Sequence, residues 1–303
     1  MTDSSNGAGD GVVYIDGDYC LKSEAKISIF DLGFLLSDCT YDALHVHKGK
    51  FFRMDEHLER FERSMAGVRL EIPYDRAAVA EIIHECVRRA GLRESMVTTI
   101  ATRGMVPPDG RRDLRKCTNG FIAAALPYHA VVTPEELAKG IDMIVATTPR
   151  IPTESVDPRI KNFNRLDFCR ALFEAYDKGA NYAVLPDYEG NLTEGLGYNV
   201  FASRGGRLIS PDWGVFEGIT RRTIFEMCAE TNVEAKLVKM KADDLHAADE
   251  VFIASTAGGI MPVSTIDGAP VGDGTPGPLT TRLTEMYWDW HEKPEYATPV
   301  QYD

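Results

Sequence analysis

One stretch of the sequence places a lysine where it could act as a nucleophile. Asp157-Pro158-Arg159-Ile160-Lys161-Asn162 is followed at once by a segment with helical periodicity. Lys161 is therefore predicted to lie where a strand-like run ends and a helix begins, and a lysine at a strand-to-helix junction can be turned into a cleft. A partly desolvated lysine can form a Schiff base. Lys161 is therefore the candidate amine, and a solvated loop lysine is the alternative.

A second stretch surrounds an acid with small and apolar residues. Asn191 to Asn199 contains Glu194, followed by glycines at positions 195 and 197. A buried carboxylate without a positive or protonated partner costs several kcal/mol. A protonated heteroaromatic nitrogen would be such a partner, so Glu194 is a candidate binding residue. An exposed turn glutamate is the alternative.

Two glycine-containing stretches could bind an anion. Gly218-Ile219-Thr220-Arg221 precedes an amphipathic helical segment, and backbone N–H groups at the start of a helix attract anions. Ser255-Thr256-Ala257-Gly258-Gly259 follows an apolar strand and adds two hydroxyls. An ordinary helix cap and an ordinary turn are the alternatives. Arg60, on a predicted helix, could add an arginine to the same anion site.

The first half of the chain alternates apolar and polar residues between glycine-containing turns. This pattern predicts strands, and two stretches of helical period lie among them. The predicted strands are 12–15, 19–21, 40–47, 51–53, 96–102 and 121–126; one helix begins with Asp55 as its N-cap and another covers 77–89. The polar loop 103–118 is too long for a simple hairpin, and such loops are usually functional or disordered.

The second half mixes strands and helices in the same way. The predicted strands are 142–147, 182–186, 198–203, 207–209, 235–239 and 250–254, and the predicted helices are 165–178, 221–231, 242–247 and 278–291. The two halves together predict an α+β fold of two domains. We place a flexible N-terminus at 1–11, a small α/β domain at 12–127, a linker at 128–134 and a larger domain at 135–303.

The composition disfavours several classes of protein. The 303 residues carry a formal net charge of −13, which argues against a nucleic-acid or anionic-membrane partner. The apolar runs are too short to span a membrane, and no apolar signal sequence opens the chain. The six cysteines form no Cys-x-x-Cys pair, which suits reduced thiols in a cytoplasm. No His-x-x-His or His-Glu-x-x-His spacing occurs, so we predict no metal site.

The candidate residues match the needs of one cofactor, pyridoxal 5′-phosphate. Its aldehyde carbon needs an amine, and its pyridine nitrogen needs an acid that keeps it protonated. Its phosphate needs N–H and hydroxyl donors and an arginine. Lys161, Glu194, the two glycine-containing stretches and Arg60 supply this set.

The same residues form motifs that are specific in combination. They are Arg53-x-Asp55-x-His57-x-x-Arg60, Ile160-Lys161-Asn162, Leu192-x-Glu194-Gly195-x-Gly197-x-Asn199, Gly218-Ile219-Thr220-Arg221 and Thr256-Ala257-Gly258-Gly259. From about Ile15 onward the chain resembles the fold-type IV pyridoxal-phosphate enzymes. These include branched-chain and D-amino-acid aminotransferases, aminodeoxychorismate lyase and (R)-selective amine transaminases. Stretches 33–41, 157–162, 256–261 and 298–302 are most similar to the (R)-selective amine transaminases.

The resemblance implies a role for each matching residue. Lys161 would be the Schiff-base lysine and Glu194 the acid at the pyridine nitrogen. The phosphate would be held by Arg60, the backbone of Ile219 and Thr220, and the hydroxyls of Ser255 and Thr256. Leu36, Tyr41, Ala43 and Ala257 would line the substrate pocket, with Arg112 of loop 103–118 as the carboxylate-binding arginine and Arg111 and Arg115 as alternatives. The implied fold is a small α/β domain and a larger pseudo-barrel domain with the cofactor between them, in a homodimer with shared active sites.

Two residues depart from the family pattern. Relatives commonly have a tyrosine or tryptophan at the position of Arg165. Arg165 would either stabilise the cofactor's phenolate oxygen or hold a substrate carboxylate bidentately, which would favour amino acids over plain amines. A helix-start arginine turned to solvent is the alternative. Leu36 stands where (R)-selective amine transaminases often have histidine, so the pocket would be more apolar.

The predicted function is (R)-selective amine:pyruvate transamination by a ping-pong mechanism. The substrates would be a small amine or amino acid and a 2-oxo acid. The main alternative is a D-amino-acid or branched-chain amino-acid aminotransferase of the same fold. An aminodeoxychorismate-type lyase and a catalytically silent, vitamin-binding protein are the remaining alternatives.

Overall fold

The computed structural model describes residues 8–302, so residues 1–7 of the predicted flexible terminus lie outside the description. The described part of that terminus includes a short 3-10 helix, Ala8–Asp10. The chain divides into two compact units. The first contains the described parts of Met1–His129 and His291–Asp303 together with Ile160–Asn164, and the second contains Ala130–Arg159 and Arg165–Trp290. The short segment around Lys161 therefore belongs to the first unit.

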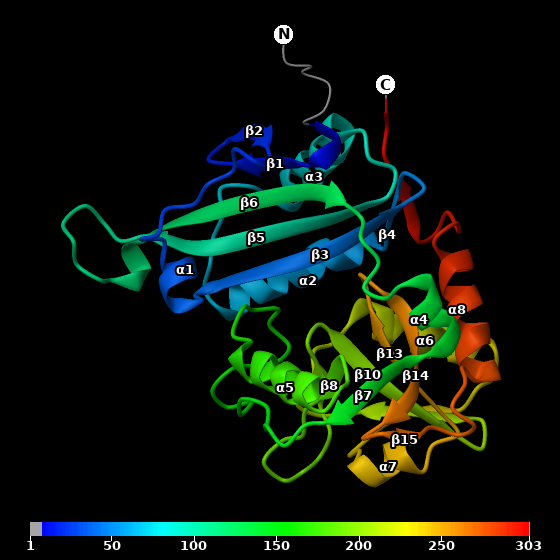
Figure 1. Cartoon of the computed structure of the whole chain (residues 1–303). Coiled ribbons are helices and arrows are strands. Elements are labelled where there is room, and N and C mark those ends of the chain that lie inside the picture. The colour runs from blue at the N-terminus through cyan, green and yellow to red at the C-terminus, as the bar shows by residue number, and fades with distance from the viewer. Residues whose placement is uncertain (1–7, 303) are drawn as a thin grey trace. The chain divides into compact units, whose positions relative to one another are not determined.

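The first unit is built on one sheet, whose strands β1 to β6 are labelled in Figure 1. Within the described residues it has seven strands in the order β16-β4-β3-β5-β6-β1-β2. All of its strand pairs are antiparallel. The strands are β1 (Val12–Ile15), β2 (Asp18–Leu21), β3 (Cys39–His47), β4 (Lys50–Phe52), β5 (Ser95–Met105), β6 (Thr118–Pro127) and β16 (Ala297–Pro299).

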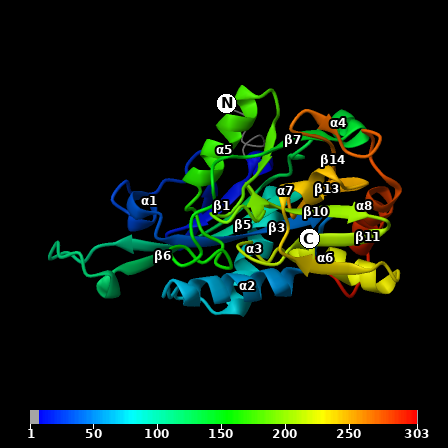
Figure 2. The same ribbon diagram turned by 90° about the horizontal axis from the view of Figure 1, so that it is seen from below.

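Helices α2 (Met54–Gly67) and α3 (Arg76–Ala90) cover one face of this sheet (Figures 1 and 2). Their apolar faces bury Phe61 and Ile83 against side chains such as Leu44 of β3. Each such side chain stabilises the unit by about 1.5–3 kcal/mol when it leaves water. Alternate residues of β3 therefore point into this core, and the residues between them, including Tyr41 and Ala43, point to the opposite face. Helix α1 (Leu32–Leu36) precedes β3.

Two local predictions in the first unit are wrong. Asp55 is not the N-cap of α2, because the helix begins two residues earlier than predicted, at Met54, and Arg53 takes the cap position in a left-handed conformation (φ 51°). The backbone N–H of Arg53 donates to Tyr296 O at 2.7 Å, a contact from the far end of the chain. Loop 103–118 is also shorter than predicted, since β5 continues to Met105 and pairs there with Thr118.

The second unit contains a mixed sheet with the strand order β12-β11-β10-β13-β14-β7-β8. β9 and β15 pair with β10 and β14 beside this path. Its strands are β7 (Ile141–Val145), β8 (Tyr182–Val184), β9 (Glu194–Gly195), β10 (Tyr198–Arg204), β11 (Arg207–Pro211), β12 (Ala235–Val238), β13 (Glu250–Ser255), β14 (Gly259–Ile266) and β15 (Ala269–Pro270). Its helices are α4 (Pro134–Lys139), α5 (Leu166–Asp177), α6 (Ile219–Glu230), α7 (Ala242–His246) and α8 (Pro278–Trp290).

Four of these helices pack against the sheet of the second unit (Figure 1). α8 contacts β13 and β14, α6 contacts β12 and β13, α4 contacts β14, and α5 contacts β8. The buried residues include Val200 and Ile253, from neighbouring strands. Among the described residues, every helix falls short of the length and hydrophobicity needed to cross a membrane. The predicted α+β fold is confirmed, with two sheets and helices packed on them.

Candidate active site

Lys161 lies in irregular backbone that is tied to β3, and not at the end of a strand as predicted. Its carbonyl oxygen accepts hydrogen bonds from Tyr41 N at 3.0 Å and Thr40 Oγ1 at 2.7 Å. Asn162 forms an isolated antiparallel bridge with Thr40. The lysine is therefore positioned through its backbone, which leaves its side chain to a separate role.

Aromatic packing positions the lysine side chain. Phe163 stacks on Tyr41 with ring centroids 4.4 Å apart and an interplanar angle of 13°. The Nζ of Lys161 lies 4.8 Å from the centroid of the same tyrosine ring. A cation at this distance from an aromatic face is attracted to it. Tyr41, predicted to line the substrate pocket, thus contacts the predicted catalytic lysine.

Arg60 is buried, with 2% of its surface exposed, beneath the same part of β3. Its Nε and Nη2 each donate to one oxygen of Asp42 at 2.7 Å, which is a bidentate ion pair. His57, one helical turn earlier, contacts the same carboxylate at 2.7 Å through Nδ1. Burial alone would raise the pKa of Asp42, but Arg60 and His57 lower it well below its usual range. The acid is therefore ionised and fixes the guanidinium.

Replacing Asp42 with asparagine removes the charge that compensates Arg60. Because a buried cation then loses its partner, we expect the free energy of unfolding to fall by about 3–5 kcal/mol at pH 7. Urea unfolding of D42N measures this loss. D55N is the matched control, since Asp55 is exposed in the first turn of α2. Equal losses in the two variants would contradict the role of Asp42.

The lowered pKa of Asp42 also gives the pH dependence of this loss a definite sign. A carboxyl whose pKa is lower in the folded protein contributes stability above its unfolded pKa, about 3.9, and loses it as the pH falls through the folded value. The difference between wild type and D42N should therefore be constant from about pH 5 to 8 and shrink below about pH 4.

Glu194 is buried in the second unit, as predicted, with 6% of its surface exposed. It opens β9, which pairs with β10 and places Glu194 opposite Asn199. The backbone N–H of Phe216 donates to Oε2 at 2.9 Å, and Nη2 of Arg150 lies 3.4 Å from Oε1. Arg150 also forms an ion pair with Asp167. The positive partner that a buried carboxylate requires is therefore Arg150, which the sequence did not indicate.

The start of α6 has the features of an anion site. Gly218 is the N-cap, and the helix begins at Ile219. A Cβ on Gly218 would lie 2.3 Å from Oδ1 of Asn199, so only glycine allows this approach. The N–H groups of the first turn, including those of Ile219 and Thr220, have no partner within the helix itself. They can hold a phosphate, which is the group this part of the sequence predicted.

Tyr287 of α8 lies beside both predicted phosphate-binding stretches. Its hydroxyl is 3.2 Å from Oγ1 of Thr220. A Cβ on Gly259, in the hairpin that joins β13 to β14, would lie 3.4 Å from its ring. Ser255 accepts a hydrogen bond from Gly258 N at 2.9 Å, which closes the turn that presents Thr256 and Ala257. The structure therefore brings the two stretches together within the second unit.

Arg165 is half-buried at the N-cap of α5. A Cβ on Gly197 would lie 4.0 Å from its Nη1, so the guanidinium lies beside the loop between β9 and β10. This position favours a role at that loop over the alternative of an arginine turned to solvent. Leu36 is exposed at the end of α1, and Ala43 is half-buried on the Tyr41 face of β3.

The predicted residues thus form two sets, each held within one unit. Lys161, Arg60 and Tyr41 lie in the first unit, around β3 and α2. The second unit holds Glu194, Arg165, Ile219, Thr220, Ser255, Thr256 and Ala257. Asp42, Arg150 and Tyr287 are the contacting residues that sequence reasoning missed. For Asp42 one signal was visible in the sequence, because this acid lies between Tyr41 and Ala43 in the predicted strand 40–47.

Comparisons with known proteins identify the family of the chain. The family model of class IV amino-transferases matches residues 40–266. A candidate branched-chain-amino-acid aminotransferase of Methanocaldococcus jannaschii is 30% identical over 284 residues, which are 93% of this chain and 96% of that protein. A D-alanine aminotransferase of Staphylococcus haemolyticus is 30% identical over 277 residues, 91% of this chain and 96% of that protein.

A solved structure is similar over nearly the whole chain. The T.th. branched-chain amino acid aminotransferase with pyridoxamine 5′-phosphate superimposes with a TM-score of 0.90 at 30% identity. The match covers 96% of this chain and 99% of that one. The chain therefore belongs to the class IV aminotransferase family and is a pyridoxal 5′-phosphate-dependent aminotransferase similar to branched-chain and D-alanine aminotransferases.

Proposed function

We propose that this protein transfers the amino group of an α-amino acid, with branched-chain L-amino acids as the leading donor class, to a 2-oxo acid. Arg165 carries the proposal. Its guanidinium lies beside the loop that follows Glu194, 4.0 Å from a Cβ built on Gly197. A planar guanidinium binds a carboxylate bidentately, whereas a plain amine offers no group for it. A donor with an α-carboxylate therefore fits this site better than a plain amine.

The complexes of the similar T.th. enzyme support a donor that carries a carboxylate. That branched-chain amino acid aminotransferase is solved with N-(5′-phosphopyridoxyl)-L-glutamate, with a TM-score of 0.89 to this chain. It is also solved with 4-methylvaleric acid, a branched carboxylic acid, with a TM-score of 0.88. Both ligands carry a carboxylate, and one has the branched carbon chain of leucine.

The candidate residues fit pyridoxal 5′-phosphate on the observations above. Lys161 would provide the amine. Glu194, whose carboxylate is contacted by Arg150, would provide a fixed negative charge for the pyridine nitrogen. The first turn of α6 and Arg60 would hold the phosphate, with the hydroxyls of Ser255 and Thr256 as further donors. When bound, this cofactor acts as an electron sink that stabilises negative charge at the substrate Cα.

Lys161 would then move the proton. Nζ of Lys161, set free when the substrate amine takes its place, would accept the proton from the substrate Cα as a base and then give it back as an acid. The contact with Tyr41 and the backbone bonds to β3 hold Nζ in place for this step. The result is a ping-pong exchange in which the 2-oxo acid product leaves before the acceptor binds.

The test is a donor panel measured on the wild type and on Arg165→Ala. We expect R165A to lower kcat/KM about 10- to 100-fold for L-leucine or D-alanine, because it removes a charge-assisted contact to the carboxylate. For (R)-1-phenylethylamine, which has no carboxylate, kcat/KM should change little. Pyruvate and 2-oxoglutarate serve as acceptors.

Arg170→Ala is the matched control, because Arg170 is an exposed arginine on the same helix. It should leave the whole panel unchanged. An equal loss with the amine and the amino acids would contradict carboxylate binding by Arg165. A wild type that shows no turnover with any donor of the panel would instead contradict the aminotransferase activity itself.

(R)-selective amine:pyruvate transamination is the second candidate. Arg112 is the observation that favours it. It is exposed in the loop between β5 and β6, and no ion pair holds it among the described residues, whereas Arg115 is paired with Asp113 at 2.9 Å. Arg112 could bind the carboxylate of pyruvate and withdraw for an apolar amine. The highest kcat/KM for (R)-1-phenylethylamine with pyruvate would establish this candidate in place of the first.

We also propose that the chain acts as a homodimer. Several apolar side chains stand exposed together in the segment before β3, and apolar surface of this kind is common at subunit interfaces. They are Ile27, Ile29, Phe30, Phe34, Leu35 and Leu36.

A further inference from the structure

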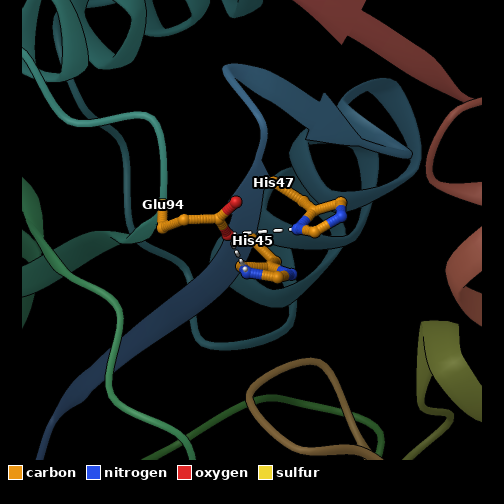
Figure 3. A group of neighbouring side chains, drawn as sticks. All are labelled: His45, His47 and Glu94. Atoms are coloured by element: carbon orange, nitrogen blue, oxygen red, sulfur yellow. Dashed lines mark hydrogen bonds and ion pairs between the residues drawn. The ribbon is translucent and has the colours of Figure 1, made fainter.

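Two histidines and a glutamate meet at one end of β3, in the first unit (Figure 3). His45 and His47 are two residues apart on the strand, so their side chains leave the same face. Glu94 immediately precedes β5, which pairs with β3 so that Ser95 lies opposite Val46. The pairing of the two strands therefore brings Glu94 to the histidines.

The three side chains point one ligand atom each toward a common position. Oε2 of Glu94 lies 3.1 Å from Nδ1 of His47 and 3.8 Å from Nε2 of His45. All three atoms lie within 4.8 Å of one another. Ligands of a tetrahedral zinc ion at 2.0–2.1 Å are separated by roughly 3.3 Å. The three atoms are thus spaced for one metal ion after small side-chain movements.

Neighbouring groups orient these ligands in the way that metal sites require. The backbone N–H of Lys48 donates to the other oxygen of Glu94 at 2.9 Å. Nε2 of His47 lies 3.9 Å from Oε1 of Glu292. The ammonium group of Lys48 lies 2.7 Å from the same oxygen, and that of Lys50 lies 2.8 Å from Oε2. A metal-bound histidine carries its proton on the other ring nitrogen and commonly directs it to a carboxylate. Glu292 is the carboxylate beside that nitrogen, and a small side-chain movement would bring it from 3.9 Å to hydrogen-bond distance.

The burial of the three residues differs in a way that suits a bound ion. His45 is almost fully buried, with 1% of its side chain exposed, while 47% of the Glu94 side chain is exposed. His45 is therefore held by its surroundings, and the Glu94 side is open to solvent, which leaves a path for entry of the ion and for a water ligand. This arrangement resembles a three-ligand zinc site with two histidines and one glutamate.

We propose that His45, His47 and Glu94 bind a divalent transition-metal ion of the zinc type. Nitrogen ligands favour such ions over Mg²⁺ and Ca²⁺, which prefer oxygen. The bound ion would link the end of β3 to the residue before β5, and thus stabilise this end of the strand pair. The prediction of no metal site rested on short sequence motifs, which cannot detect a ligand 47 residues away from His47.

Zinc binding to the chelator-treated holoenzyme tests the site. We expect one Zn²⁺ per chain by competition with a chromogenic chelator, and no competition from millimolar Mg²⁺. Glu94→Gln and His47→Gln should each weaken binding at least about 100-fold, since each removes a ligand directly, and outer partners alone are worth 10- to 100-fold. Glu292→Gln, which retains all three ligands, should weaken binding by a smaller factor.

His129→Gln is the control, because it removes an exposed histidine of the same unit. It should bind zinc as the wild type does. Equal affinity in wild type, E94Q and H47Q would overturn the site and leave a hydrogen-bonded His47–Glu94 pair, with zinc held adventitiously elsewhere. Circular dichroism confirms folding of each variant. Because Glu94 is exposed and glutamine keeps its shape, E94Q tests the site even if H47Q fails to fold.

Discussion

Replacing Lys161 with alanine should abolish transamination, with kcat reduced by at least about 10⁴-fold. Under the proposed function, the variant would lack both the amine that holds the cofactor and the base that moves the Cα proton. Steady-state assays with L-leucine, D-alanine and (R)-1-phenylethylamine measure this loss. Borohydride reduction of the wild type should attach the cofactor to the peptide that contains Lys161, and the same treatment of K161A should attach none there.

The loss in K161A should come without unfolding. The bonds that fix this segment run from Tyr41 N and Thr40 Oγ1 to the backbone oxygen of residue 161, so alanine keeps them. The unfolding midpoint should therefore stay close to that of the wild type. K26A, which changes an exposed lysine of the same unit, is the control with full activity. Turnover by K161A at more than about a hundredth of the wild-type rate would contradict the assigned role.

Replacing Glu194 with glutamine should lower kcat by about 10²–10³-fold, the size of effect expected when one preorganised electrostatic contact is lost. Glutamine keeps the shape and the hydrogen bond from Phe216 N but removes the charge. Without that charge, a pyridine nitrogen beside residue 194 holds its proton less well. Stopped-flow absorbance of the first half-reaction measures the change directly.

A control for E194Q is available in the same part of the chain. Glu189 is exposed in the turn that precedes Asn191, so E189Q changes an equal charge outside the buried position. Arg150 keeps Asp167 as a partner in E194Q, which limits the loss of stability to that of one contact. Equal half-reaction rates in E194Q and E189Q would show that the buried charge plays no part in the reaction.

Much of the fold could be predicted because local signals were strong. The hairpin 12–21 has alternating residues around Asp16-Gly17, and α3 ends at Gly91 in the left-handed conformation that glycine adopts easily. The capping box of α4, formed by Thr133 and Glu136, is another signal of this local kind. Such features depend on residues close together in the sequence.

The features that were missed depend on contacts between distant residues. The N-cap of α2 is set by a hydrogen bond from Arg53 N to Tyr296, far along the chain. β16 was not among the predicted strands, because a three-residue edge strand has little pattern of its own; it exists because it pairs with β4. β14 was also absent from the predicted strands, although it lies between β13 and β7.

The site shows the same division. Residue type and spacing indicated Lys161, Glu194 and Arg60, but not the residues that hold them. Arg60 pairs with Asp42 over 18 residues, and Glu194 approaches Arg150 over 44. Tertiary structure alone creates such pairs, and burial makes them strong, because charges removed from water must find a partner.

The most direct test of the central claim is the first half-reaction measured without an acceptor. The wild-type holoenzyme is mixed with L-leucine, D-alanine or (R)-1-phenylethylamine, and the carbonyl product is counted per active site. We expect one equivalent of 2-oxo acid from an amino acid, formed faster than acetophenone from the amine. Acetophenone from the amine, with no 2-oxo acid from either amino acid, would contradict an amino-acid aminotransferase.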